Sequence, residues 1–204
     1  MNVYDFDKTI FVGDTEDRFF DFMFKQKGFR HYKPIWHFWN TLNKLGLMKK
    51  TRSRELQYSF LKKIDRMGNL DAQIKAYWDE IEQYMMPWYD KVKRPDDVIA
   101  SGTPRFILEP IVKKLGIGGL VATEMDTRTG KIDGDFAVGE FKVVNFRNQY
   151  GLDCIDKFYS DAWSDHFLAE YAKEAYIVHE DETIDEWNAW FEAHPEDKGK
   201  KQFR

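Results

Sequence analysis

The sequence predicts an α/β fold, in which a Rossmann-like parallel sheet carries an inserted block of α-helices. Three observations lead to this prediction. A short apolar strand opens the chain at residues 2–6, and after Pro95 apolar strands alternate with helices, as in proteins with a parallel sheet. Between these regions, residues 14–88 show helical periodicity and no convincing strand.

The helical block follows a turn between Thr9 and Gly13. Its apolar residues recur every three or four positions, which places them on one face of a helix. Four helices are expected, on the apolar series Phe19/Met23 with Phe20/Phe24, Trp39/Leu42/Leu45, Leu56/Phe60/Ile64, and Ile74/Trp78/Ile81/Met85. We therefore expect residues 1–13 and 89–204 to form the α/β core domain and residues 14–88 to form a helical cap.

The remainder of the chain supplies most of the predicted sheet. Strands are expected at residues 98–101, 120–122, 155–160 and 175–178, and helices at residues 104–115, 141–150, 165–171 and 184–191. Gly116 is expected to end the first of these helices. A turn-rich segment, Asp126–Lys131, predicts a hairpin or small flap within residues 122–137. The charged tail from Pro195 is expected to fray.

Composition excludes several classes of protein. The chain has 204 residues, with 31 basic and 35 acidic side chains, and this near-balance gives no reason to expect a nucleic-acid partner. Its single cysteine, Cys154, excludes an internal disulfide framework and a Cys-rich zinc site. Charged residues begin at Asp5, so no secretion signal is expected, and no long apolar run predicts a transmembrane helix. A reduced, cytoplasmic compartment fits these features.

Asp5 and Asp7 lie two residues apart at the end of the first predicted strand. Carboxylates this close repel each other unless a cation or a proton lies between them, and Mg²⁺ prefers oxygen ligands of this type. A carboxylate is also a competent nucleophile toward phosphorus, and a second one can protonate the leaving oxygen and then activate water. An ordinary polar strand end is the plainer interpretation.

Other polar residues follow or end predicted strands, or begin helices. Because ligands of parallel sheets bind beyond the carboxyl ends of the strands, these residues are candidates for one site. Ser101, at the end of a strand and before a helix, suits a phosphate oxyanion. Lys142 could neutralise phosphate and nucleophile, while Asp161 and Asp165 could complete a cation site. A turn residue, a surface lysine and acids at a helix start are the plainer alternatives.

These motifs, taken in order, resemble the four motifs of the haloacid dehalogenase-like hydrolase superfamily, in its phosphatase branch. The likeness covers nearly the whole chain, and the helical block is similar to the type 1 (C1) cap of that family. Within the family, the chain looks most like the phosphoserine-phosphatase-like subgroup (subfamily IB). The motifs are Asp5-Phe6-Asp7-Lys8-Thr9, Ser101-Gly102-Thr103-Pro104 through Glu109-Pro110, Gly139-Glu140-Phe141-Lys142, and Asp161 with Asp165.

The resemblance implies Mg²⁺-dependent hydrolysis of a phosphomonoester through a phospho-aspartate. Asp5 would be the nucleophile, Asp7 the general acid and base, and Lys142 the residue that stabilises the phospho-aspartate. The residues implied to contact the phosphoryl group are Thr9, Ser101 and Gly102, and those implied to ligate Mg²⁺ are Asp5, Asp7, Asp161 and Asp165. Asp7 also argues against dehalogenation, because dehalogenases of this superfamily lack the second acid.

The sequence departs from the family pattern in two places. Bulky Trp163 lies within the fourth motif, beside the expected metal ligands. Phosphoserine enzymes of the subgroup carry a glutamate early in the cap and an arginine later, both of which read the amino acid. Here the early position is Asp14, and Arg52 or Arg54 could supply the cation. L-phosphoserine is therefore not favoured as the substrate.

The cap is expected to decide the substrate, because it closes over the phosphate and excludes water. Its many aromatic residues are expected to form mainly its own core. Its apolar and basic character also leaves open a lipid or head-group phosphate, as in phosphatidylglycerophosphate phosphatases, and a weak contact with a membrane surface. We expect a small phosphorylated metabolite as substrate. A lipid phosphatase, a phosphotransferase and a non-catalytic phosphate-binding module are the alternatives, and the oligomeric state stays open.

Overall fold

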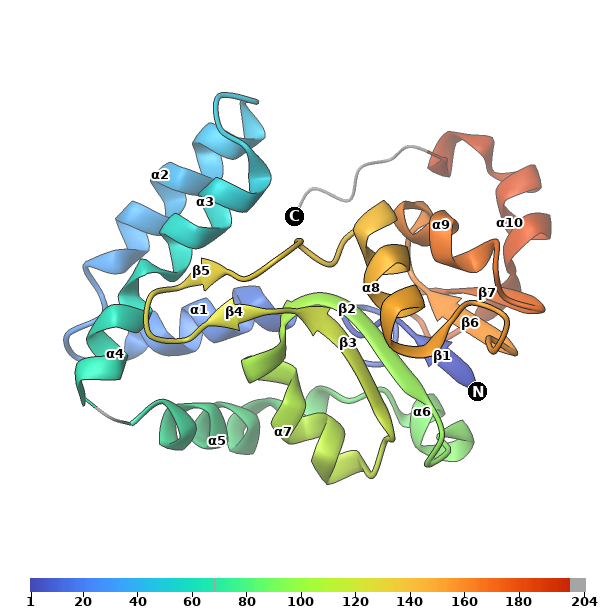
Figure 1. Cartoon of the computed structure of the whole chain (residues 1–204), viewed down its shortest axis with the longest axis horizontal. Helices are drawn as coiled ribbons and strands as arrows, with labels where there is room; N and C mark the ends of the chain where they lie inside the picture. Colours follow the sequence, from blue (N-terminus) through green and yellow to red (C-terminus); the bar gives the residue numbers. More distant parts are fainter. Residues whose placement is uncertain (68, 199–204) are drawn as a thin grey trace.

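A six-stranded sheet forms the centre of the protein in a computed structural model that describes residues 1–67 and 69–198 (Figure 1). The strand order is β3-β2-β1-β6-β7-β8. The strands are β1 (Asn2–Tyr4), β2 (Val98–Pro104), β3 (Gly119–Thr123), β6 (Lys157–Ser160), β7 (Glu174–Val178) and β8 (Ile184–Glu186). All neighbouring pairs are parallel except β7 and β8, which are antiparallel. The predicted α/β class with a parallel core sheet is confirmed.

The first strand of the chain occupies the middle of the sheet. On one side Val3 of β1 lies opposite Val98 of β2, and on the other it lies opposite Phe158 of β6. All three β1 residues are buried. Because β1 has a parallel neighbour on each side, the residues that follow it are flanked by the carboxyl ends of β2 and β6.

Four helices follow the later strands and cover the sheet. They are α7 (Arg105–Leu115), α8 (Glu140–Tyr150), α9 (His166–Ala169) and α10 (Trp187–Ala193). Helix α7 ends at Gly116, whose φ of 71° is the left-handed conformation that glycine adopts readily, as predicted. The helix expected at residues 165–171 is shorter, because a 3₁₀ turn over Trp163–Asp165 precedes α9.

Every regular element between β1 and β2 is helical, and several of these helices form the left part of Figure 1. They are α1 (Thr15–Lys25), α2 (Tyr32–Lys44), α3 (Lys50–Gln57), α4 (Leu61–Met67), α5 (Leu70–Ile81) and α6 (Pro87–Val92). The third predicted helix is interrupted by a 3₁₀ turn over Tyr58–Phe60. This turn allows Tyr58, Phe60 and Leu61 to be buried together, which a single α-helical face would not permit. The domain boundaries near residues 13 and 88 remain predictions.

The segment expected to be one helix at residues 184–191 has two parts, so that prediction is wrong in its first half. A turn, in which the His179 N–H donates to the Thr183 carbonyl, sends the chain back along β7 as β8. Helix α10 then starts at Trp187, with the Glu186 side chain accepting from the Ala189 N–H at 2.7 Å as its N-cap. Of the tail, Pro195–Asp197 form a 3₁₀ turn, and residues 199–204 lie outside the described residues.

A small hairpin reaches from the core to the helical block. Strands β4 (Met125–Asp126) and β5 (Lys131–Ile132) pair antiparallel, which confirms the hairpin predicted in this segment. Gly130, with a φ of 73°, lies so close to Tyr58 that a Cβ there would be 2.5 Å from the Tyr58 carbonyl oxygen. Among the described residues, no helix combines the length and the apolar content needed to span a membrane.

Candidate active site

A cavity of about 610 Å³ lies between the carboxyl ends of the central strands and the helical block. Asp5 after β1, Ser101 in β2 and Asp161 after β6 line its floor. Trp36 and Asn40 of α2 are among the residues that line its roof. The cavity therefore opens where side chains from three adjacent strands meet, as the positions of these residues at strand ends lead one to expect.

Lys142 joins two acidic side chains at the floor of the cavity. Its Nζ donates to Asp5 Oδ1 at 3.0 Å and to Asp165 Oδ2 at 2.7 Å, and Ser160 Oγ donates to the same Asp165 oxygen at 2.8 Å. Burial alone would lower the pKa of Lys142, but the carboxylates of Asp165 and Asp5 outweigh it and raise the pKa. Lys142 is therefore held in its charged form beside Asp5.

Burial and the charge of Lys142 have opposite effects on the pKa of Asp5. Burial raises the pKa of Asp5 to about 6, although Lys142 lowers it. The lysine donates to Oδ1, and the Phe6 N–H also donates to this carboxylate. A carboxylate held in place by a buried ammonium group has the orientation that a nucleophile requires.

Asp7 is held by groups from two parts of the chain. Its Oδ1 accepts hydrogen bonds from the N–H and hydroxyl of Thr15, with the N–H at 2.7 Å, and Thr103 Oγ1 lies 2.8 Å from its Oδ2. Burial and the nearby Asp14 raise the pKa of Asp7 well above its usual range, against the effect of Thr15. The sequence motifs did not single out Thr15 or Thr103. Their only signal was their place, at a helix start and directly after Ser101-Gly102.

The acids around Asp5 provide ligands of the kind that Mg²⁺ accepts. Burial, together with the charges of Asp5 and Asp165, raises the pKa of Asp161 to about 8, so a cation here would relieve a real repulsion. The described residues contain no cluster of three or more His, Cys, Asp or Glu side chains arranged as a complete metal site. Mg²⁺ does not require one, because it commonly binds through one or two carboxylates with waters and phosphate oxygens. Asp5 and Asp161 fit that pattern.

Asp165 lines the same cavity and is tied to the buried lysine. Its Oδ2 accepts from both Lys142 and Ser160, and its side chain is only 6% exposed. These contacts fit a role in positioning Lys142, and the contact with the metal expected of Asp165 stays a prediction. The spacing of Asp161 and Asp165 in the sequence could not reveal this, because it does not show which acid faces the lysine.

Ser101 and Gly102 form a tightly packed floor beneath the loop that follows the hairpin. Ser101 is 1% exposed, and its Oγ accepts from the Thr103 N–H at 3.1 Å. A Cβ on Gly102 would lie 2.6 Å from Cγ1 of Val138, which also lines the cavity. Glycine is thus required here by close packing, since its φ is not in the left-handed region.

Replacing Gly102 with alanine is expected to push Val138 away and to lower the free energy of unfolding by about 1–3 kcal/mol. Urea denaturation of the wild type and of Gly102→Ala measures this loss. The double variant Gly102→Ala/Val138→Ala is the matched control, since it removes the methyl group that clashes. It should be less destabilised than the sum of the two single variants. Strict additivity would show that the contact with Val138 is not the cause.

Thr9 does not line the cavity, contrary to its expected contact with the phosphoryl group. Its side chain is fully buried, and its hydroxyl has no hydrogen-bond partner among the described residues. The carbonyl of Thr9 instead accepts from Trp88 Nε1 at 3.1 Å. The turn that follows Asp7 directs the threonine inward, and its spacing in the motif could not show this.

The expected cap residues are only partly in the cavity. Asp14 lines it, and its side chain caps α1 by accepting from the Asp17 N–H at 2.9 Å. Arg52 does not line it: its guanidinium pairs with Glu55 at 3.2 Å, and its side chain is 59% exposed. The helical turn of α3 brings Arg54 to the cavity instead, two positions further on.

Arg54 is paired with Glu16, an acid that sequence reasoning missed. The two side chains lie 3.0 Å apart, and Tyr58 Oη donates to the other Glu16 oxygen at 2.7 Å. Burial raises the pKa of Glu16 to about 7, although Arg54 opposes this shift. The feature of the sequence that could have indicated Glu16 was its position, two residues after Asp14 in the first turn of α1. Only the fold shows that it faces Arg54 across the cavity wall.

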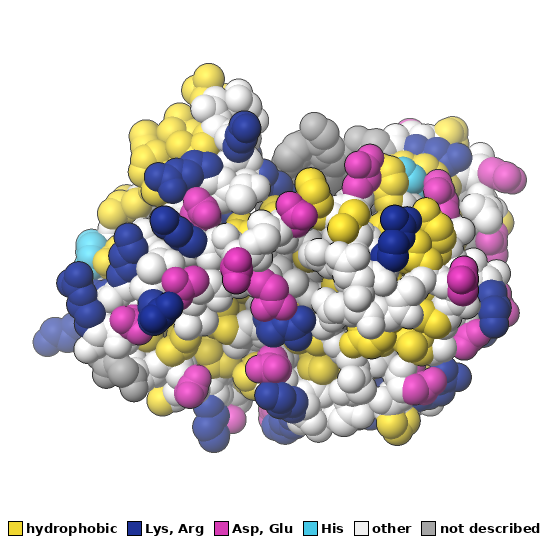
Figure 2. Space-filling view, viewed as in Figure 1, with side chains coloured by type: hydrophobic (Ala, Val, Ile, Leu, Met, Phe, Trp, Pro, Cys, Tyr) yellow, Lys and Arg dark blue, Asp and Glu magenta, His cyan; other side chains and the backbone are white. Residues whose placement is uncertain are grey.

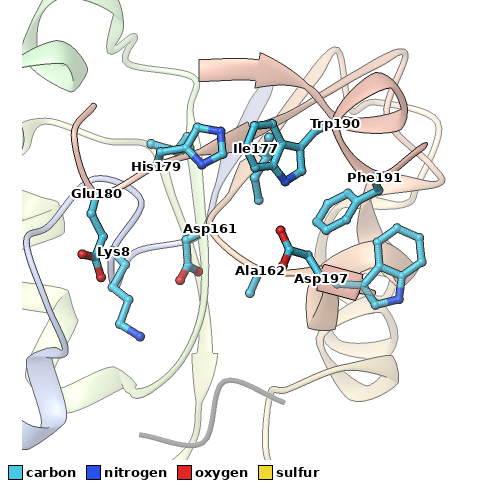
Figure 3. A pocket seen from close by; sticks show the side chains of 11 residues that line it. Lys8, Asp161, Ala162, Ile177, His179, Glu180, Trp190, Phe191 and Asp197 are labelled. Carbon is cyan, nitrogen blue, oxygen red and sulfur yellow. The ribbon is translucent and has the colours of Figure 1, made fainter. Parts of the chain in front are cut away.

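A second, smaller cavity of about 230 Å³ adjoins the first (Figure 3). Lys8 and Asp161 line both cavities, and Trp190, Phe191 and Asp197 close the smaller one from the C-terminal part of the chain. Lys8 has a φ of 59°, an uncommon backbone conformation for a lysine. Asp161 is therefore reached from two sides, the cap side and the C-terminal side.

Comparisons with known proteins bear on this geometry. A family model described as haloacid dehalogenase-like hydrolase matches residues 3–170, and no curated protein matches the chain. A solved structure of a protein with unknown function from Bordetella pertussis Tohama I has a TM-score of 0.73 and 18% identity, covering 86% of this chain and 87% of that one.

Two further solved structures are similar in fold. A phosphoserine phosphohydrolase-like protein from Francisella tularensis subsp. tularensis SCHU S4 has a TM-score of 0.54 and 15% identity, covering 86% of each chain. A substrate-bound phosphoserine phosphatase has a TM-score of 0.50 and 15% identity, covering 85% of this chain and 82% of that one. At these identities the likeness concerns the fold.

Proposed function

Because the chain belongs to the haloacid dehalogenase-like hydrolase family, we propose that it is a Mg²⁺-dependent phosphatase that cleaves a small phosphate ester through a phospho-aspartate at Asp5. The resemblance to this family noted in the sequence is confirmed at the family level. The observation that carries the proposal is the contact of buried Lys142 with both Asp5 and Asp165, at the end of the central strand.

The first half of the reaction uses Asp5 and Lys142. A carboxylate oxygen of Asp5 attacks phosphorus, a new P–O bond forms to the carboxylate, and the bond from phosphorus to the leaving oxygen breaks. Lys142 stays charged throughout and offsets negative charge on the phosphoryl group and the acyl-phosphate. Ser101 and the Gly102 backbone line the same floor and are available to phosphoryl oxygens.

Asp7 gives a proton to the leaving oxygen and later accepts one from the attacking water. Because the Thr15 N–H can only donate to Oδ1, the proton of a neutral Asp7 carboxyl resides on Oδ2, beside Thr103. That proton passes to the leaving oxygen. The carboxylate then accepts a proton from the water that attacks the phospho-aspartate, which releases inorganic phosphate and restores Asp5.

Mg²⁺ would be held by Asp5, Asp161 and the backbone carbonyl of Asp7, and would supply positive charge at the phosphoryl oxygens. Asp161 is the residue best suited to this role. It is half-buried beside Asp5, and a cation would relieve the repulsion that its carboxylate experiences from Asp5 and Asp165.

The proposal is tested by incubating the purified protein with para-nitrophenyl phosphate and Mg²⁺. Turnover is expected with Mg²⁺ and should disappear in excess chelator and return when Mg²⁺ is restored. Turnover that persists in chelator would contradict the metal requirement. Adding an acceptor alcohol separates a hydrolase, which yields inorganic phosphate, from a phosphotransferase, which yields a new ester. Phosphate binding without turnover over a broad panel of esters would indicate a non-catalytic module.

Replacing Asp7 with asparagine is expected to affect esters according to their leaving groups. An alkyl phosphate, whose alkoxide needs a proton, should lose about 10²–10⁴-fold in rate of phospho-aspartate formation. Para-nitrophenyl phosphate should lose much less in that step, because nitrophenolate leaves without a proton. Single-turnover kinetics with the two esters measure the difference, and equal losses would contradict the assignment of Asp7 as the acid.

The cavity favours a polar leaving group. Asn40, Asn43 and Gln57 offer amides, and Lys44 and Lys50 offer ammonium groups. Arg54 is already neutralised by Glu16, so a substrate carboxylate would have to compete with a buried carboxylate for it. We therefore place phosphorylated polar metabolites ahead of L-phosphoserine. A panel of amino-acid, sugar, nucleotide, choline-type and lipid phosphates compares these classes directly.

A further inference from the structure

The helical block has an unusual distribution of charge. Residues 22–54 contain nine of the 31 basic residues of the chain and none of its 35 acidic residues. This stretch includes helix α2, the loop after it and the start of α3. In a protein with a net charge of −4, the hairpin of α2 and α3 is thus a strongly cationic projection (Figure 1).

Some of these cations have acidic partners outside the stretch. Lys33 pairs with Asp21, Arg52 with Glu55 and Arg54 with Glu16. Lys49, which follows the loop between α2 and α3, has no ion pair with any of the described residues, while Lys44, which precedes the loop, lines the cavity, where its charge acts on Asp17. The part of the hairpin with the least neutralisation is therefore its loop end.

Large apolar side chains are exposed along α2 and in the loop that follows it. We call Ile35, Phe38, Leu45 and Leu47 the apolar tip; their exposed fractions are 40%, 54%, 66% and 72%. Ile35, Phe38 and Leu45 lie on one side of the helical axis at their spacing, and α2 has no fully buried residue. Figure 2 shows hydrophobic side chains gathered over the projecting hairpin, with Lys and Arg next to them.

We propose that the apolar tip and its flanking lysines dock on the surface of a lipid bilayer that contains anionic lipids. Transfer of leucine and phenylalanine side chains from water into the acyl region is favourable, and lysines beside them are attracted to the anionic head groups. The hairpin has the charge complementarity that this partner requires, since residues 22–54 contain no acidic side chain.

Other partners fit the surface less well. Two copies of this hairpin packed face to face would bring like charges together, which disfavours a symmetric contact. A nucleic acid would use the cations but would leave Leu45 and Leu47 without an apolar partner. A bilayer satisfies both the charge and the apolar side chains.

Docking would place the catalytic cavity beside the lipid surface. Trp36, Asn40 and Asn43, on the same helix as Phe38, line the cavity from the inner side of α2. The inference does not rest on the proposed chemistry, because binding to vesicles requires no turnover. Its failure and the failure of the phosphatase proposal would therefore be seen in different measurements.

The experiment is co-sedimentation of the full chain with vesicles of phosphatidylcholine alone or with about 30 mol % phosphatidylglycerol added. The wild type should partition onto the anionic vesicles, and Phe38→Ser/Leu45→Ser/Leu47→Ser should lower this partitioning by at least about 10-fold. Lys49→Glu should lower it as well, and high salt should weaken what remains. None of these four residues lines the catalytic cavity, and an unchanged circular dichroism spectrum and thermal unfolding midpoint serve as the check that the variants are folded.

Matched controls carry the same changes elsewhere on the surface. Val92→Ser/Tyr171→Ser/Ile184→Ser removes three exposed apolar side chains from the surface of the α/β domain, and Lys91→Glu reverses an exposed charge on the same domain. Both should bind anionic vesicles like the wild type. Wild-type protein that stays in the supernatant, or equal partitioning of the tip variant and its control, would overturn the proposal. So would a dimer in sedimentation velocity that the tip substitutions dissociate, without vesicle binding, since the occupant would then be a second copy.

Discussion

Asparagine in place of Asp5 is expected to reduce turnover of para-nitrophenyl phosphate by at least about 10⁴-fold, the scale seen when a covalent nucleophile is removed. The amide has nearly the same shape as the carboxylate, but its oxygen and nitrogen are poor nucleophiles toward phosphorus. Lys142 keeps its second partner, Asp165, at 2.7 Å, so the floor of the cavity should stay ordered.

The measurement combines steady-state rates with acid-quench mass spectrometry. Wild-type protein quenched during turnover should carry the added mass of one phosphoryl group, and Asp5→Asn should carry none. Asp21→Asn is a suitable control, because Asp21 is largely exposed and lies outside the cavity. A phosphorylated Asp5→Asn protein would show that another residue is the nucleophile.

Methionine in place of Lys142 is expected to reduce both activity and stability. The buried carboxylates of Asp5 and Asp165 would lose the charge that faces them, and breaking such a buried pair costs about 3–5 kcal/mol. Activity should fall by about 10²–10³-fold, the loss found when one group that stabilises the transition-state charge is removed. Lys113→Met, which removes an exposed pair with Glu109, should change stability by no more than about 1 kcal/mol.

The stability loss in Lys142→Met should depend on pH. Burial raises the pKa of Asp5 to about 6 even with Lys142 present, and loss of the lysine would raise it further. An acid with a raised pKa in the folded state favours folding at low pH and loses that contribution as pH rises through its folded pKa. The deficit of Lys142→Met should therefore be largest near pH 8 and smaller near pH 5. Urea denaturation in chelator at both pH values tests this, and a pH-independent deficit would contradict it.

The apolar opening strand and the alternation of strands and helices after Pro95 predicted the five parallel strands but not β8, and the strand-end rule indicated which residues would meet. Asp5, Ser101 and Asp161 come together for that reason, because parallel strands end at one edge. Side-chain direction is a different matter. Thr9 turns inward and Arg52 outward, and both depend on local turns that motif spacing does not encode.

The residues that sequence reasoning missed are recognisable only through contacts distant in sequence. Glu16 is part of the cavity wall because it binds Arg54 and Tyr58, which lie about forty positions away along the chain. Ile184–Glu186 reads as part of an amphipathic helix, because the pairing with β7 that makes it a strand overrides its local preference. Thr15 and Thr103 likewise matter because Asp7 lies between them.

The central position of β1 has a consequence for how the protein is made. Strand β1, which directly precedes Asp5, is synthesised before its partners, which begin at Val98 on one side and Lys157 on the other. During translation it must remain without its neighbours in the sheet while the helices up to α6 emerge. Closing such long loops is entropically unfavourable, and topologies dominated by distant pairings fold slowly. Asp5 thus leaves the ribosome well before Ser101, Lys142 and Asp161, and its surroundings can be assembled only after those residues have been made.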